Sequence, residues 1–237
     1  MLYLLTGDIQ IGKTRWLEAR LEELAKAGVA VHGVLSPGVW VPREPDAEDP
    51  RPFEKTGINL VFYPEKERVR FAERLRPDDF TDNDEDGYDE PEDTGSADGP
   101  ETETLTGAPL AGEEAAPRPQ KVAGQILGWK FYSYWFGRVN EMFADLREGG
   151  VDCAQGPERR LVVVDEIGRL EMAGRGFTEV MAFLQDGENA AWPHAVAIVR
   201  SELLEKARAL LEPAWSERLR VIHPDDAGKA ALFSLFA

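Results

Sequence analysis

Cysteine and histidine are scarce in this sequence. Its 237 residues include one cysteine, Cys153, and three histidines, His32, His194 and His223. A single cysteine excludes an internal disulfide and a cysteine-rich metal site. The three histidines are too far apart in the sequence to show metal-ligand spacing. Because chains without disulfides are typical of reducing compartments, we expect a cytoplasmic protein.

Long apolar runs are absent as well. No run approaches the roughly 18 residues that a membrane-spanning helix needs. The first apolar segment, residues 1–6, leads directly into a glycine-rich turn, which leaves no room before it for a signal peptide. We therefore expect a soluble chain without a membrane partner.

The chain is also poor in positive charge, and its net charge is −17. Residues 77–120 contain fifteen acidic residues and one base, Arg118, so this segment carries −14 of that charge. The remainder is nearly neutral and lacks the basic footprint of a nucleic-acid-binding protein. The acidic segment has few large apolar side chains, which predicts a disordered insertion. We expect it to interrupt a single domain that spans residues 1–237.

What the sequence does contain is an alternation of short apolar segments and segments with helical spacing. Residues 39–52 hold four prolines and are expected to form a loop. The alternation predicts an α/β fold with a mostly parallel sheet flanked by helices. The expected strands are 1–6, 29–35, 57–63, 68–72, 161–164, 195–199 and 218–222, and the expected helices are 13–27, 131–147, 177–184 and 202–211.

A complete G-x-x-x-x-G-K-[ST] motif follows the first strand and precedes the first helix. Glycines let the backbone fold around an anion, and the helix N-terminus favours negative charge. We expect Lys13 to reach the β- and γ-phosphates and Thr14 to coordinate Mg²⁺. Asp8 is expected to point into solvent. The predicted nucleotide-binding residues are Gly7, Asp8, Ile9, Gln10, Ile11, Gly12, Lys13, Thr14 and Arg15.

Two acids follow the most apolar strand, Leu-Val-Val-Val, at Asp165 and Glu166. Ligands of open α/β sheets bind at the carboxyl edge of the strands, so Asp165 is expected to hold Mg²⁺. Glu166 is placed to act as a general base on an attacking water. The catalytic set that we predict is Lys13, Glu166 and Arg169, with Arg169 stabilising transition-state charge. Arg200 is a second candidate for that cation.

Taken together, several segments resemble the THEP1-type nucleoside-triphosphatase family of P-loop proteins. The most specific is the D-E-I-G-x-x-E run at 165–171, which ends at Glu171. Two features depart from the family pattern, namely Arg15, where a second hydroxyl residue often stands, and the acidic insertion. The other matching segments are the P-loop, 33–38, 55–60, 128–131, the helix reaching Asn140, and 199–200.

The resemblance implies a RecA-like P-loop fold and slow Mg²⁺-dependent hydrolysis of nucleoside triphosphates with loose base selectivity. The expected ligand is thus ATP, GTP or another NTP, with Mg²⁺ as cofactor. One rival is a nucleotide or nucleoside kinase, which usually has an arginine-rich lid, whereas the long insertion here is acidic. Another rival is a non-catalytic nucleotide-binding regulatory module. Nothing in the sequence specifies an oligomeric state.

Two further features allow alternative interpretations. Residues 129–136 contain six aromatic side chains, which are expected to pack into the core as part of a helix. If one of them stacks on the base, Trp129 and Tyr132 are the preferred candidates. Ser36, at the end of the second expected strand, is either a turn residue before Pro37 or a residue that faces the phosphates.

Overall fold

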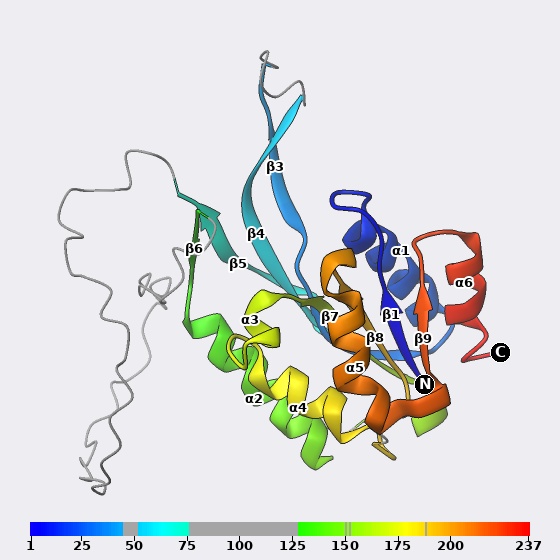
Figure 1. The fold of residues 1–237 in the computed structure, drawn as a ribbon. Helices are drawn as coiled ribbons and strands as arrows, with labels where there is room; N and C mark the ends of the chain where they lie inside the picture. The colour runs from blue at the N-terminus through cyan, green and yellow to red at the C-terminus, as the bar shows by residue number, and fades with distance from the viewer. Residues whose placement is uncertain (45–51, 76–127, 150, 152, 188) are drawn as a thin grey trace, which may run out of the picture.

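A computed structural model describes residues 1–44, 52–75, 128–149, 151, 153–187 and 189–237 (Figure 1). The acidic segment 77–120 lies outside these residues. The described chain forms a nine-stranded mixed sheet with helices on both faces. The predicted α/β class is therefore confirmed.

One half of the sheet is parallel, in the order β2-β7-β8-β1-β9. Its strands are short, and all except the edge strand β9 are mostly buried because helices cover both faces. Their carboxyl ends lie at one edge, where the P-loop and Asp165 are found. The strands are β1 (Leu2–Leu5), β2 (Ala30–Leu35), β7 (Arg160–Ile167), β8 (Ala195–Val199) and β9 (Leu219–Ile222).

The other half is antiparallel and extends from β2 through β4 (Phe53–Tyr63), β5 (Glu67–Arg74) and β6 (Trp129–Phe131). The hairpin between β4 and β5 turns at residues 64–66. A further strand, β3 (Gly38–Pro42), pairs with β4. Figure 1 shows β3 and β4 rising together beyond the rest of the sheet.

Two predictions about this half are wrong. The predicted loop 39–52 does not begin at residue 39, because a valine–tryptophan–valine run at 39–41 pairs with β4 and Pro42 stands at the end of the strand, where a proline is tolerated. The predicted helix 131–147 does not begin at Phe131, because Phe131 pairs with β5 as the last residue of β6. The helix begins only at Tyr134.

Helices α2, α4 and α5 cover one face of the sheet, and α1 and α6 cover the other. In α1, Leu17, Leu21 and Leu24 recur at helical spacing and are buried. Gly28 lies just past this helix with φ of 81°, a conformation that glycine adopts readily at a helix end. The bounds are α1 (Lys13–Lys26), α2 (Tyr134–Glu148), α3 (Arg169–Met172), α4 (Thr178–Asp186), α5 (Leu204–Trp215) and α6 (Asp226–Phe233).

Of the six aromatic residues at 129–136, three pack against the core, namely Phe131, Trp135 and Phe136, whereas Tyr134 is exposed. Phe131 and Phe136 pack against Phe71, and Phe136 also packs against Phe177. Trp135 packs against Phe62. Within the described ranges, no helix has both the length and the apolar character needed to cross a membrane.

Candidate functional site

The P-loop connects the end of β1 to the first turn of α1. Gly7 and Gly12 have φ of 152° and 95°, a region that favours glycine, and Gly12 directly precedes the helix. The Trp16 amide donates to the Gly12 carbonyl 2.8 Å away and closes the first turn. The expected strand–loop–helix context of the motif is therefore present.

Lys13 lies across this loop. Its Nζ donates to the carbonyl oxygens of Gly7 at 2.7 Å and of Asp8 at 3.0 Å. The ammonium group is thus positioned at the loop by local backbone bonds, and an anion held by the loop would meet a cation there.

The tip of the P-loop is open to solvent. Asp8 is exposed, as expected, and so are Gln10 and Arg15. Ile9 and Ile11 are apolar, yet 69% and 55% of their surfaces are exposed. Side chains at the tip therefore point away from the loop interior, which leaves the backbone amides to face an anion.

Asp165 lies near the carboxyl end of the parallel core strand β7 and is only 2% exposed. The Ser36 amide donates to its Oδ2 at 3.0 Å, and the Ser36 hydroxyl donates to its carbonyl oxygen. The Thr14 side chain lies beside the carboxylate and helps to lower the pKa of Asp165. The structure therefore brings together Thr14 and Asp165, the two predicted Mg²⁺ ligands, from segments far apart in the sequence.

The electrostatics of Asp165 follow from this burial. Desolvation and then the charge of Glu166 raise the pKa of Asp165 to about 6, while bonds from Ser36 and Thr14 and the charge of Lys55 act in the opposite direction. Because burial disfavours the charged form of this carboxylate, a cation bound beside it would stabilise that form strongly. Carboxylate and hydroxyl oxygens are the donors that Mg²⁺ prefers.

Glu166 forms an ion pair with Arg200, which directly follows β8. The Nε and one terminal nitrogen of Arg200 lie 2.7 Å and 2.6 Å from Glu166 Oε1. Both side chains are partly exposed. Arg169, the other candidate cation, is exposed at the first position of α3. The structure thus brings Arg200 to Glu166.

Lys55, on β4, is a site residue that the sequence did not identify. It is half-buried, and burial lowers its pKa, whereas the charges of Glu166 and Asp165 oppose that lowering. Its ammonium nitrogen lies 5.5 Å from the centroid of the Trp129 ring. A side chain at Gly38 would put its Cβ 2.8 Å from Lys55 Cε, so the glycine makes room for this lysine.

Glu171, the last acid of the D-E-I-G-x-x-E run, is buried and has a structural role. Its two carboxylate oxygens accept from the amides of Gly168 at 2.9 Å and Phe177 at 3.1 Å. These bonds fix the short helix α3 directly after Glu166. Burial raises the pKa of Glu171, and the backbone amides counteract it.

The two aromatic candidates for base stacking lie in the antiparallel half of the sheet. The ring of Trp129 faces the ammonium of Lys55. Tyr132 lies beside Glu73, and burial followed by the charge of Glu73 raises its pKa. Ser36 directly follows β2 and contacts Asp165, at the carboxyl edge of the parallel strands.

Searches against protein-family models, curated proteins and solved structures yield no match to this chain.

Proposed function

We propose that this chain is a Mg²⁺-dependent nucleoside-triphosphatase of RecA-like P-loop architecture, which hydrolyses NTPs to NDP and phosphate with loose base selectivity. The observation that supports this most strongly is the proximity of Thr14, the first-turn hydroxyl beside Lys13, to the carboxylate of Asp165 near the carboxyl end of β7. Residues 151 positions apart in the sequence lie side by side, as the proposed nucleotide–metal site would require.

The P-loop backbone and Lys13 would bind the β- and γ-phosphates. The oxygens of Thr14 and Asp165 would hold Mg²⁺ together with phosphate oxygens, because magnesium sites commonly combine one or two protein oxygens with phosphates and water. The described residues contain no cluster of three or more His, Cys, Asp and Glu that could hold a metal without the nucleotide. When bound, Mg²⁺ would neutralise charge on the phosphate oxygens.

Glu166 would orient an attacking water and accept its proton. Its ion pair with Arg200 holds the carboxylate at the carboxyl edge of the sheet, and Arg200 would then provide a cation beside the bound γ-phosphate. Lys55 supplies a second cation through its proximity to both acids. Arg200 and Lys55, together with Arg169 as the first residue of α3, are therefore the candidates to stabilise charge on the γ-phosphate.

The experiment that tests this function follows phosphate release from ATP, GTP, CTP and UTP with Mg²⁺. In the hydrolase, Glu166→Gln should lower kcat at least about a hundredfold, a general base being worth about 10²–10⁴. Binding of the triphosphate should stay within about threefold of wild type. Glu202→Gln, a nearby exposed substitution, is the matched control and should leave kcat unchanged.

The two rivals give different results in the same assay. A non-catalytic nucleotide-binding module would show equally slow hydrolysis in wild type and Glu166→Gln. A strict kinase would form ADP only when an acceptor is added, with little release of phosphate in its absence. Either result would contradict the hydrolase proposal.

A further inference from the structure

A pocket lies along the outer part of the projecting β3–β4 hairpin, beside Gln10 of the P-loop. It has a volume of about 70 Å³. Figure 1 shows the hairpin rising next to the edge of the sheet that carries the P-loop. The residues that line this hairpin pocket are Gln10, Trp40, Arg43, Phe53, Glu54, Lys55 and Arg74.

The chemistry of the hairpin pocket is cationic and aromatic. Arg43, Lys55 and Arg74 contribute three positive groups, and one carboxylate, Glu54, lies 3.6 Å from Arg74. This composition contrasts with the net charge of −17 on the whole chain. A volume of this size accommodates a phosphate group, which arginine and lysine donors recognise.

Two large aromatic side chains line the pocket. Trp40 is 42% exposed and Phe53 is 53% exposed, although tryptophan and phenylalanine are usually buried. Exposed aromatic rings beside arginines are what proteins use to stack nucleobases next to a bound phosphate. The ligand that fits both properties is a small nucleotide, with its phosphate in the cavity and its base on the rings.

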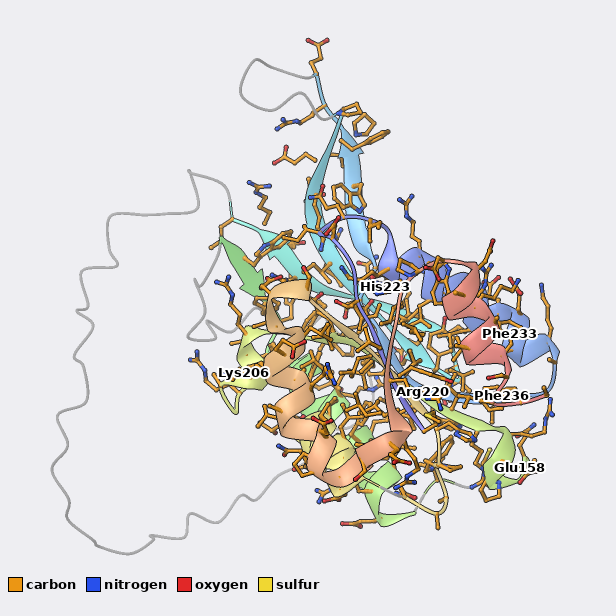
Figure 2. All side chains as sticks on the ribbon, turned by 45° about the vertical axis from the view of Figure 1, so that its right-hand side comes forward. Glu158, Lys206, Arg220, His223, Phe233 and Phe236 are labelled. Carbon is orange, nitrogen blue, oxygen red and sulfur yellow. The ribbon has the colours of Figure 1, made fainter. Side chains whose placement is uncertain are left out.

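The position of the pocket relative to the proposed NTP site indicates which nucleotide would bind in it. Lys55 lines the pocket and also lies within the electrostatic influence of Asp165 and Glu166, which would mark the γ-phosphate end of the proposed site. The other side of the P-loop adjoins the segment after β9, where a methyl group at Gly7 would lie 3.7 Å from Pro224 Cδ. His223, the neighbour of Pro224, is labelled at the end of β9 in Figure 2.

A triphosphate has its nucleoside and its γ-phosphate at opposite ends. With the γ-phosphate at Glu166, the nucleoside of the bound NTP extends away from Lys55. A second molecule can therefore bind in the hairpin pocket. There it would lie next to the γ-phosphate of the bound NTP.

We propose that the hairpin pocket binds a nucleoside monophosphate, which accepts the γ-phosphoryl group. This inference depends on the proposed nucleotide site. An oxygen of the acceptor phosphate forms a bond to the γ-phosphorus, and the bond from that phosphorus to the β–γ bridging oxygen breaks, with its electron pair passing to the departing NDP. The acceptor phosphate is largely dianionic at neutral pH, since its second pKa is about 6, so no proton has to be removed. In the absence of the acceptor, water takes its place and Glu166 accepts the proton.

The test uses the full chain, Mg²⁺ and ATP labelled in its γ-phosphate, with AMP, GMP, CMP and UMP added in turn. The expected result is label in the corresponding NDP, saturable in at least one monophosphate. Trp40→Ala and Arg43→Ala should each raise the KM for the monophosphate at least about tenfold, the lower end for a base-stacking contact or a charged hydrogen bond. Phosphate release without monophosphate should stay within about twofold of wild type.

Two controls keep the result specific. Trp40→Phe retains a ring and should keep the monophosphate KM within about threefold of wild type, which separates lost stacking from misfolding. Arg220→Ala removes an exposed arginine on β9, the edge strand away from the hairpin, and should leave both activities unchanged.

The outcomes separate this inference from the proposed function. ATP hydrolysis with no label in any NDP overturns the acceptor pocket and leaves the hydrolase intact. A monophosphate that binds without accepting label also overturns it, as does transfer that Trp40→Ala and Arg43→Ala leave unaltered. Transfer without any hydrolysis supports the pocket and overturns the hydrolase.

Discussion

At the residue scale, Lys13 is the clearest test of nucleotide binding, because its ammonium already lies at the loop on the carbonyls of Gly7 and Asp8. Lys13→Ala should weaken ATP binding about ten- to a hundredfold, since hydrogen bonds to charged groups contribute about 1.5–3 kcal/mol. Isothermal titration calorimetry measures this directly. Lys26→Ala, in the exposed last turn of the same helix, is the control. Wild-type affinity in Lys13→Ala would refute the nucleotide site.

The raised pKa of Asp165 predicts how the stability of the chain depends on pH. Its pKa in the folded chain is about 6, above the ordinary value of 3.8, so the folded state holds this proton more tightly than the unfolded state. Stability is therefore lost as pH rises from about 4 through 6. Asp165→Asn removes this cost. The difference in free energy of unfolding between the variant and wild type should therefore shift in favour of the variant by about 1–2 kcal/mol between pH 5 and pH 8.

Urea denaturation without Mg²⁺ or nucleotide would measure this difference at each pH. Asp145→Asn, an exposed carboxylate on α2, shows what an ordinary aspartate contributes. An Asp165→Asn advantage that shrinks with rising pH would contradict the assigned direction of the pKa shift.

At the scale of elements, the short helix α3 depends on Glu171, which accepts from two backbone amides. Glu171→Ala leaves two buried donors without their partner, each costing about 1–3 kcal/mol. We expect the free energy of unfolding to fall by about 2–5 kcal/mol and kcat to fall with it, because α3 follows Glu166 directly. Chemical denaturation and phosphate release measure the two effects.

Glu141→Ala, exposed on α2, is the control for an ordinary helical glutamate. A Glu171→Ala chain with wild-type stability and lost turnover would instead indicate a direct role in the chemistry. Normal stability together with normal turnover would mean that α3 does not need this acid.

How much of the site could be predicted depends on how local each feature is. The P-loop and the end of β7 are continuous segments whose residue types specify their own geometry, and the structure brings them together as predicted. Thr14 and Asp165 meet because parallel strands align their carboxyl ends. The parallel half of the sheet could thus be predicted from strand order and apolar runs.

Lys55 and the hairpin pocket could not be predicted in this way. Lys55 reaches the acids only because β4 joins the sheet next to β2, a pairing between distant segments. The strand β3 was obscured by nearby prolines, although it pairs with β4 up to Pro42. Register between antiparallel strands depends on tertiary packing, which local propensity does not specify.

At the scale of the whole molecule, the two halves of the sheet have different tasks. The parallel half positions the P-loop, Asp165 and Glu166, while the antiparallel half brings Lys55 and the hairpin arginines to the same edge. Positive groups are therefore concentrated where anions are expected to bind, in a chain whose net charge is −17. The net negative charge of the chain should then repel an approaching nucleotide at long range. The positive groups at the site should attract the same nucleotide at short range.

The acidic segment 77–120 should cause most of that opposition, since it carries −14 and is inserted between β5 and β6, the strands beside the hairpin pocket. Replacing its acids with Asn and Gln at constant length removes the charge alone. The KM for MgATP should fall a few-fold at about 0.01 M ionic strength, where the Debye length is about 30 Å, and return to wild type near 1 M, where it is about 3 Å. Steady-state kinetics across a salt series measures this. If the KM is unchanged at low salt, the segment does not repel the nucleotide, and a salt-independent change would mean that it acts by contact rather than by charge.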